Sequence, residues 1–298
     1  MAHPLQRQAE IVELSPVGAY HRLVLRAEDI AERVLPGHVV AVAVGGPDSA
    51  MLMRRAFFVH RADPDEQTLE IVFSEQGGSD QGRGTRELAQ ARVGGTLDIV
   101  APLGNAFPVP NGPVSALLVA GGHGSVPLFG LADLIREHGG SVSFILGAPD
   151  AGRLFGVDRA KELTPDVLVT TEDGSYGIRG HVTLPLAEAM KAIDAGVVYA
   201  SGPTSVLRAV TETATKLDVR CFTAVEETMA CGVGICGVGT CLACVLPVVG
   251  DDGVSRFARA CVEGPCFDGT RVRWDDIGTV PPDVEGAAAM DLGVTGAY

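Results

Sequence analysis

Roughly the first hundred residues alternate short apolar runs with Gly, Pro and Asp, a pattern typical of β-strands joined by tight turns. The expected strands are Ala9–Leu14, Tyr20–Ala27, Val39–Val44, Phe57–Arg61, Thr68–Phe73 and Thr96–Ala101. One helix is expected at Thr85–Ala91, with Thr85 as its N-cap after a pair of glycines. Strands at such close spacing predict an antiparallel barrel or sandwich.

The pattern then changes to apolar strands that alternate with amphipathic helices. Strands are expected at Ala116–Ala120, Ser141–Leu146, Val167–Thr171 and Val197–Ser201, and helices at Val126–Glu137, Leu184–Ala192 and Thr204–Lys216. This alternation predicts a parallel sheet with crossover helices. A cysteine-rich segment follows, and the tail from about Val280 is expected to be a loose extension because it is rich in Pro, Gly and Ala.

Length and composition favour a multidomain enzyme. The chain has 298 residues, of which 46% are hydrophobic and only 5% aromatic, so its cores are expected to consist of Val, Ala, Leu and Ile. The formal charge of −14 and the absence of a basic run argue against nucleic-acid binding. No apolar stretch is long enough for a membrane span, and no signal-peptide pattern is seen. We therefore expect a cytoplasmic protein that binds neither nucleic acid nor membrane.

The segment Cys231–Cys244, which reads CGVGICGVGTCLAC, carries the strongest chemical signal of the chain. Cys236, Cys241 and Cys244 have the spacing C-x4-C-x2-C, and Cys261 follows at a distance. This is the plant-type arrangement of thiolates around a 2Fe–2S cluster. The glycines between the cysteines allow the backbone turns that such a loop needs. We predict Cys236, Cys241, Cys244 and Cys261 as the cluster ligands.

Three alternatives to this ligand set remain. The loop contains a five-residue repeat, CGVGI and then CGVGT, so Cys231 competes with Cys236, although a set beginning at Cys231 would need a cysteine where Gly239 stands. Four cysteines also suit a structural zinc site, but only Cys241 and Cys244 form a CxxC pair. A disulfide framework is disfavoured because the number of cysteines, seven, is odd and the chain is long.

Other motifs are compatible with phosphate binding. Gly82–Thr85, which reads GRGT, precedes the expected helix and would present free backbone N–H groups, but it also suits an ordinary surface turn. Gly121–Gly124, which reads GGHG, follows a buried strand at the position where dinucleotide-binding sheets accept a pyrophosphate, without the full G-x-G-x-x-G spacing. The guanidinium groups of Arg54 and Arg55 suit a pyrophosphate, or they charge a strand edge.

Eight motifs occur in an order that identifies a family. They are LMRRAF at 52–57, GRGT at 82–85, PLGNAF at 102–107, GGHG at 121–124, EDGSYG at 172–177, SGP at 201–203, CGVGTCLAC at 236–244 and CVEGP at 261–265. In this order, over roughly residues 5–275, the chain resembles the electron transfer subunits of NAD-linked, B-type dihydroorotate dehydrogenase, within the ferredoxin reductase superfamily.

The resemblance implies a multidomain fold of the β plus α/β class. An antiparallel FAD-binding β-barrel is expected at 1–111, a parallel-sheet NAD-binding domain at 112–220, a small C-terminal 2Fe–2S domain at 221–278 and a tail at 279–298. The residues implied to contact FAD are Arg55, Ala56, Phe57, Phe58, Gly82, Gly84 and Thr85. Those implied to contact NAD are Gly121, Gly122, Gly124 and Glu172, with Asp173 as the alternative acid; an acid near the ribose favours NAD over NADP. No catalytic acid or base is assigned.

The activity implied by the resemblance is electron transfer. Electrons would pass from an FMN-containing dihydroorotate dehydrogenase catalytic subunit, which oxidises dihydroorotate to orotate in pyrimidine biosynthesis, through 2Fe–2S and FAD to NAD. The complex would be a heterotetramer with two copies of each subunit. One alternative is a related NAD(P)H reductase subunit of a hydrogenase, sulfite reductase or ferredoxin–NADP reductase complex. Another is a non-catalytic binding protein with a zinc-stabilised tail.

Overall fold

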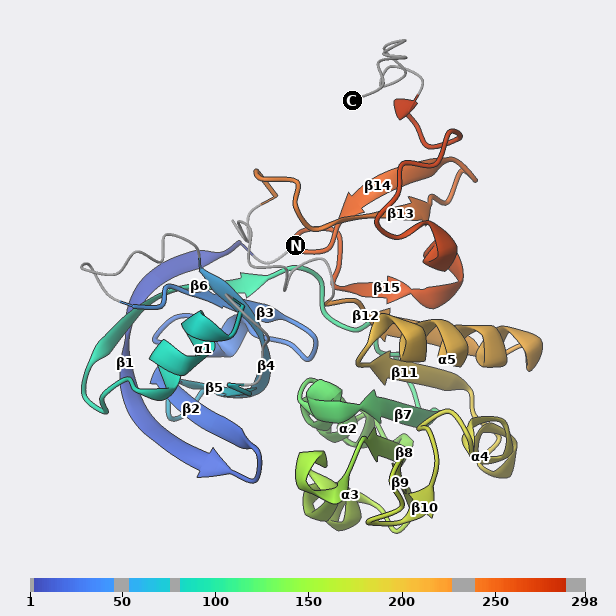
Figure 1. Cartoon of the computed structure of the whole chain (residues 1–298), viewed down its shortest axis with the longest axis horizontal. Helices are drawn as coiled ribbons and strands as arrows, with labels where there is room; N and C mark the ends of the chain where they lie inside the picture. Colours follow the sequence, from blue (N-terminus) through green and yellow to red (C-terminus); the bar gives the residue numbers. More distant parts are fainter. Residues whose placement is uncertain (1–2, 46–53, 76–80, 227–238, 288–298) are drawn as a thin grey trace.

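The computed structural model describes residues 3–45, 54–75, 81–226 and 239–287, which form three units in chain order. Figure 1 shows a barrel (blue to cyan), a sheet covered by helices (green to yellow) and a small third unit (orange to red) above the sheet. Both the barrel and the parallel sheet expected from the sequence are therefore present.

The first unit is a closed six-stranded antiparallel barrel with the strand order β1-β2-β5-β4-β3-β6. Its core consists of apolar side chains such as Leu25, Ile71 and Ile99, which are fully buried. Leu88, from the helix α1, is buried among them, so α1 packs onto the barrel interior. The elements are β1 (Leu5–Val17), β2 (Tyr20–Arg26), η1 (Ala31–Arg33), β3 (Val39–Val42), β4 (Arg55–Asp63), β5 (Thr68–Phe73), α1 (Gln81–Ala89) and β6 (Thr96–Leu103).

The start of α1 differs from the prediction. The helix begins at Gln81, so Gly82–Thr85 lies inside its first turns rather than before it, and Thr85 is not the N-cap. Two glycines lower helix propensity, which is why the sequence predicted a loop. Packing overrides that propensity here, because Leu88 anchors the helix in the barrel and Gly84 lies directly against Arg55.

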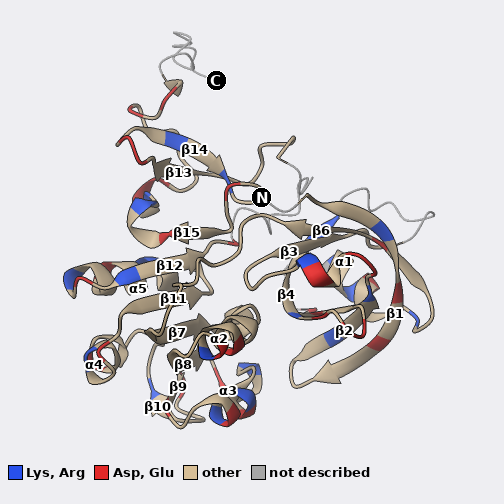
Figure 2. Ribbon diagram, turned by 180° about the vertical axis from the view of Figure 1, so that it is seen from behind, with Lys and Arg blue, Asp and Glu red and all other residues tan. Residues whose placement is uncertain are grey.

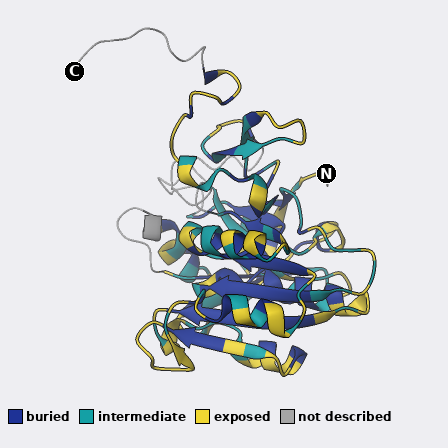
Figure 3. Ribbon diagram, turned by 90° about the vertical axis from the view of Figure 1, so that its right-hand side faces the viewer, coloured by how far each residue is buried: buried dark blue, intermediate teal, exposed yellow. Residues whose placement is uncertain are grey.

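The second unit is built on a seven-stranded sheet with the order β10-β9-β8-β7-β11-β12-β15. All neighbouring pairs are parallel except β12 and β15, which are antiparallel. Figure 3 shows the buried strands between helices whose outer faces are exposed, as expected for near-continuous apolar strands. The elements are β7 (Ser115–Gly121), η2 (Gly122–Ser125), α2 (Leu128–Glu137), β8 (Ser141–Ala148), η3 (Ala151–Arg153), α3 (Val157–Leu163), β9 (Val167–Thr171), β10 (Ile178–Arg179), α4 (Leu186–Ala192), β11 (Val197–Ser201), α5 (Thr204–Lys216), β12 (Arg220–Ala224) and β15 (Cys266–Asp268).

The third unit contains the antiparallel hairpin of β13 (Val245–Val249) and β14 (Ser255–Arg259), followed after β15 by η4 (Gly269–Arg271) and η5 (Trp274–Asp276). The boundary expected between residues 220 and 221 runs through β12, which pairs with β11. On strand pairing, the second unit therefore extends to residue 224, and β15 returns to it.

The tail was expected to be loose, but its described part is attached to the third unit. Val284 is only 3% exposed, and the Glu285 amide donates a hydrogen bond of 2.8 Å to the Ser255 carbonyl. The Glu285 carboxylate also pairs with Arg256 at 2.5 Å. Residues 284–285 are therefore held against β14, and the expectation of a loose tail is wrong at these two residues.

One continuous core joins the three units. Phe58 and Phe107 of the barrel, Tyr199 of β11 and Cys261 of the third unit belong to the same cluster of buried residues. Hydrogen bonds cross the contacts as well: the Tyr199 hydroxyl donates to the Pro108 carbonyl at 2.7 Å. The units are thus packed against one another rather than joined only by linkers.

The surface agrees with the acidic composition. Figure 2 shows Lys and Arg interspersed with Asp and Glu along the ribbon of all three units. Within the same residues, none of the helices combines the length and the apolar character needed to cross a membrane.

Candidate functional site

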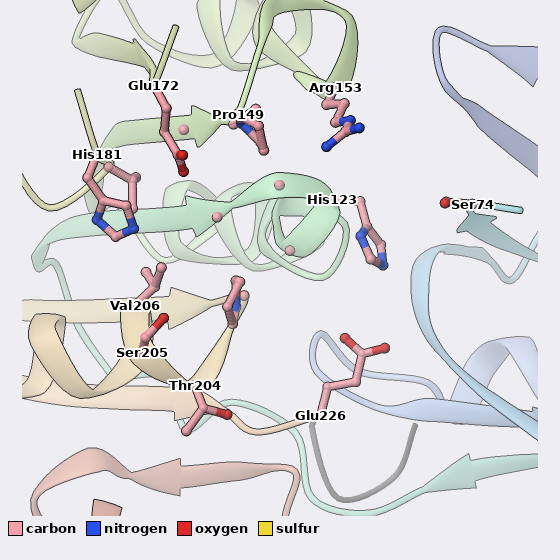
Figure 4. A pocket seen from close by; sticks show the side chains of 18 of the residues that line it. Ser74, His123, Pro149, Arg153, Glu172, His181, Thr204, Ser205, Val206 and Glu226 are labelled. Carbon is pink, nitrogen blue, oxygen red and sulfur yellow. The ribbon is translucent and has the colours of Figure 1, made fainter. Parts of the chain in front are cut away.

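A cleft of about 750 Å³ opens at the carboxyl ends of the parallel strands, on the side that faces the barrel (Figure 4). β7 lies in the sheet between β8 and β11. From β7 the chain proceeds through β8 and β9 to β10 on one side, and it then returns to the other side of β7 to form β11 and β12. Such a switch in strand order leaves a crevice in which α/β sheets bind nucleotides. The barrel contributes Ala19, Tyr20 and Ser74 to the lining. The cleft therefore lies where a nucleotide on the sheet would meet the barrel.

All four residues predicted to contact NAD line this cleft: Gly121, Gly122, Gly124 and Glu172. The glycine turn requires residues without a Cβ atom. A Cβ atom on Gly124 would lie 2.4 Å from the Ser201 carbonyl oxygen, so only glycine allows η2 to approach β11 this closely. Gly122 has a φ of +62°, in the left-handed region that favours glycine.

The structure separates the two candidate acids. The Glu172 carboxylate points into the cleft in Figure 4. The Asp173 carboxylate instead accepts hydrogen bonds from the Ser175 hydroxyl at 2.7 Å and the Ser175 amide at 2.9 Å, within its own turn. These bonds from Ser175 lower the pKa of Asp173. Glu172 is therefore the acid available to a ribose in the cleft.

Sequence reasoning missed several polar residues of the cleft, which are Tyr20, Arg153, His181, Thr204, Ser205 and Glu226. Arg153 follows β8 in η3 and brings a guanidinium to the rim, four residues after Pro149. Its carbonyl accepts a 2.6 Å hydrogen bond from the Tyr20 hydroxyl, which joins the barrel to the sheet unit. Burial raises the pKa of Tyr20, so this hydroxyl stays protonated as the donor. No motif marks Arg153, because its place depends on how β8 ends.

In the barrel, Arg55 and the glycine segment of α1 lie together. A Cβ atom on Gly84 would be 2.9 Å from the Arg55 Nε atom, so the arginine side chain lies against this glycine. Arg54 is engaged elsewhere: it pairs with the Asp98 carboxylate at 2.8 Å and donates to the Asp98 carbonyl at 2.8 Å. Of the two arginines, Arg55 is thus the one placed beside the helix start where a phosphate would bind.

The other predicted FAD residues divide between the two faces of β4. Phe57 lies beside Phe73, with ring centroids 5.7 Å apart, and packs against the barrel core. Phe58 is 6% exposed and belongs to the core shared with the sheet unit, against which Ala56 also packs. Gly82 and Thr85 lie with Gly84 in the first turns of α1. Contact of these residues with FAD stays a prediction.

The hairpin of the third unit brings two of the predicted cluster ligands together. The Cys244 and Cys261 sulfurs are 3.2 Å apart, too far for a disulfide, and both residues are buried. The Cys261 amide donates to the Cys244 sulfur at 3.5 Å. Hydrogen bonding from Cys261 lowers the pKa of Cys244 to about 6. Two converging thiols of this kind fit a thiolate-bound metal centre.

The other two predicted ligands, Cys236 and Cys241, are not part of this buried pair in the described residues. Cys241 is exposed, in the turn before β13. Cys236 and its competitor Cys231 lie outside the described residues, so the choice between them stays open. Over the stretches that are described, no group of three or more possible metal ligands is assembled.

A comparison with protein families bears on the cysteine segment. Residues 235–273 match the iron–sulfur cluster binding domain of dihydroorotate dehydrogenase B. The match spans Cys236, Cys241, Cys244 and Cys261. It supports an iron–sulfur centre over the zinc alternative.

Curated relatives match most of the chain. The electron transfer subunit of dihydroorotate dehydrogenase B (NAD(+)) from Shouchella clausii is 33% identical over 250 residues, which are 83% of this chain and 90% of the relative. The subunit of the same name from Enterococcus faecalis is 30% identical over 277 residues, or 90% of this chain and 99% of the relative.

Solved structures share the fold over most of this chain. An NADH-dependent reduced ferredoxin–NADP oxidoreductase, studied for flavin-based electron bifurcation, superposes with a TM-score of 0.73 at 27% identity, covering 91% of each chain. Phthalate dioxygenase reductase superposes with a TM-score of 0.56 at 18% identity, covering 86% of this chain and 77% of its own, and shows the fold alone.

Proposed function

Because this chain belongs to the family of electron transfer subunits of dihydroorotate dehydrogenase B (NAD(+)), we propose that it carries electrons between a catalytic partner subunit and NAD. The observation that carries this proposal is the cleft at the strand ends. Its lining combines Gly121–Gly124 and Glu172 from the sheet with Tyr20 and Ser74 from the barrel. A nicotinamide nucleotide held by the sheet would therefore reach the unit in which FAD is proposed to bind.

The NAD site consists of the glycine turn and one acid. Gly121, Gly122 and Gly124 allow the dinucleotide to approach the ends of β7 and β11 closely, and Glu172 accepts hydrogen bonds from a ribose. Arg153 at the rim supplies a positive charge for the phosphates.

The FAD site lies on the barrel. Arg55 and the start of α1 hold the pyrophosphate, since the guanidinium and the helix N-terminus both favour a negative charge. The proposed contacts are Arg55, Ala56, Phe57, Phe58, Gly82, Gly84 and Thr85. Phe58 contributes an apolar wall, because its buried side chain has no group that hydrogen-bonds a flavin.

The 2Fe–2S site consists of Cys236, Cys241, Cys244 and Cys261. When bound, the cluster exchanges one electron at a time, whereas flavin stores two and nicotinamide takes a hydride; the protein supplies their placement. The chain supplies the buried Cys244 and Cys261 thiols, whose sulfurs lie 3.2 Å apart and would bind the metal as thiolates.

The partner follows from the family. We propose an FMN-containing catalytic subunit that oxidises dihydroorotate, in a cytoplasmic heterotetramer with two copies of each chain. Light scattering of the purified complex measures this stoichiometry; a mass equal to one copy of each chain contradicts the tetramer.

A spectrum of the purified chain tests the cofactors. Flavin and iron–sulfur absorption, both bleached by NADH, are expected. A colourless, zinc-loaded protein contradicts the proposal and leaves the non-catalytic binding protein. Metal analysis of the same sample identifies iron or zinc directly.

A second candidate function is supported by the structural match to the ferredoxin–NADP oxidoreductase, with its TM-score of 0.73. In that case the chain would serve a different partner complex, and it would form no stable complex with an FMN-containing dihydroorotate dehydrogenase subunit on co-expression. Isolation of a stable complex of the two chains favours the first function.

A further inference from the structure

The turn that ends β6 is hydrogen-bonded directly to the turn that follows Cys261. The backbone amide of Asn105 donates to the Gly264 carbonyl at 2.5 Å. The side-chain amide of Asn105 donates to the Glu263 carbonyl at 2.8 Å. One residue of the barrel unit thus holds two consecutive carbonyls of the segment that carries a predicted cluster ligand.

The backbones of the two turns are in direct contact at Gly104. Gly104 has a φ of +76°, and a Cβ atom there would lie 2.4 Å from the Gly264 carbonyl oxygen and 2.6 Å from Pro265 Cδ. Any side chain at this position would force the turns apart. We call residues 104–105 and 263–265 the clasp.

The cluster side of the clasp is held from two further directions. The Val225 amide, just after β12, donates to the Pro265 carbonyl at 2.9 Å, which ties the turn to the sheet. The Glu263 carboxylate accepts from the Arg259 amide at 2.7 Å and from Arg259 Nε at 3.0 Å. Its side chain is therefore occupied within the third unit, and its carbonyl is the group that faces Asn105.

The position of the clasp relates it to electron transfer. Cys261 lies two residues before Glu263 and is buried beside Cys244. On the barrel side, the clasp continues β6, which pairs with β3 within the unit proposed to hold FAD. Functional groups must be held in a fixed geometry by rigid supporting contacts, so a short rigid connection between the two units has a functional consequence for the cofactors proposed in them.

From this geometry we infer that Asn105 is a positioning residue for electron transfer between the cluster and FAD. Its two hydrogen bonds hold the Cys261 segment against the barrel and so set the distance between the two centres. The inference rests on the proposed function for the cofactors, and it adds a role for a residue outside the proposed cofactor contacts.

The test replaces Asn105 with Asp. The change is nearly isosteric, but it removes the side-chain donor and places a carboxylate oxygen against the Glu263 carbonyl. Asn111→Asp is the matched control, because this exposed asparagine of the linker before β7 receives the same charge outside the clasp. Asn105→Ala removes the side-chain hydrogen bond without adding repulsion, so its effect should lie between the wild type and Asn105→Asp.

Stopped-flow reduction by NADH separates two steps. NADH first gives a hydride, two electrons and one proton, to FAD and leaves as NAD⁺. Reduced flavin then gives one electron to the oxidised cluster, and the second electron stays on the flavin. We expect Asn105→Asp to leave flavin reduction unchanged and to slow cluster reduction, because one lost hydrogen bond shifts the clasp equilibrium about fivefold toward the open form and the carboxylate shifts it further. Asn111→Asp should match the wild type in both steps.

Hydrogen exchange gives a readout independent of activity. In Asn105→Asp, amides of residues 259–267 should exchange about fivefold faster, while those of β1 and β2 keep wild-type rates. Gly104→Ala should show a larger increase in the same segment.

The outcomes are distinct. Unchanged cluster reduction in a fully loaded Asn105→Asp protein overturns the positioning role, and so does equal slowing of both steps, which indicates a general structural defect. A wild-type protein that carries no flavin or cluster overturns the proposed function and the inference together.

Discussion

Replacing Glu172 with Gln tests the acid of the NAD cleft. The substitution keeps the size of the side chain and removes its charge, while the main-chain bond from the Glu172 amide to the Ala148 carbonyl, at 3.1 Å, is unaffected. Flavin reduction is therefore expected to change only through nucleotide binding. The neighbouring Asp173→Asn is the matched control, because that carboxylate is bonded to Ser175 within its turn.

The magnitude follows from the exposed position of Glu172. A hydrogen bond to a charged group contributes about 1.5 to 3 kcal/mol, and the lower value suits an exposed group, so NADH should bind about tenfold more weakly to Glu172→Gln. A 2′-phosphate about 4 Å from the wild-type carboxylate is repelled by roughly 1 kcal/mol in water-like surroundings, and the substitution removes this repulsion for NADPH. The preference for NADH over NADPH should therefore fall by more than tenfold.

The assay is flavin reduction followed by absorbance at a series of NADH and NADPH concentrations, which gives an apparent Kd for each nucleotide. Equal weakening for both nucleotides would refute the reasoning, because it would place Glu172 away from the 2′ position. An equal loss of NADH affinity in Asp173→Asn would show that the effect arises from the turn rather than from the Glu172 carboxylate in the cleft.

Three further predictions concern the cluster, the flavin and the pH dependence of stability. Cys236→Ser should abolish the EPR signal of the reduced cluster while Cys231→Ser keeps it; the reverse result would assign Cys231 as the ligand. Arg55→Gln should release FAD on gel filtration, whereas Arg54→Gln should retain it because Arg54 is engaged with the β6 carboxylate; equal retention would contradict the pyrophosphate assignment. Burial lowers the pKa of His38 to about 4, below its unfolded value of about 6.5, so the unfolded chain binds the proton first as the pH falls. This residue should consequently lower the free energy of unfolding by about 2 kcal/mol between pH 7 and pH 5. Urea titrations of His38→Asn should lack this contribution to the dependence of the free energy of unfolding on pH. The same pH dependence in His38→Asn and in the wild type would contradict the assignment.

Much of the fold could be predicted because local pattern and tertiary structure agree. The short apolar runs of β2, β3, β5 and β6 occur close to their expected positions. The continuous apolar run at β7 predicted a strand buried on both faces, and six of its seven residues are buried. In these segments the side chains that favour a strand are the same ones that fill the core.

Several of the missed elements lack such a signal. α3 has seven residues and a largely charged sequence, VDRAKEL, and β10 has only two residues. β15 becomes a strand because it pairs with β12, about forty residues earlier, so its own composition does not identify it. The early start of α1 likewise depends on contacts with Arg55 and the barrel core.

The functional site also contains residues that the sequence predicts and residues that it does not. Spacing alone predicted that Cys244 and Cys261 converge, and position after a buried strand predicted the glycine turn. Tyr20 and Arg153 could not be found in this way, because their hydrogen bond joins two units that only packing brings together. The clasp at Asn105 is of the same kind, since its partners lie 158 residues further along the chain.

The most direct test of the whole account is electron transfer by the assembled complex. The chain is co-expressed with an FMN-containing dihydroorotate dehydrogenase catalytic subunit, the complex is purified, and NADH formation is followed after addition of dihydroorotate and NAD⁺. The account predicts dihydroorotate-dependent NADH formation that requires both subunits and is lost in Cys261→Ser. A well-formed, fully loaded complex that forms no NADH would contradict it.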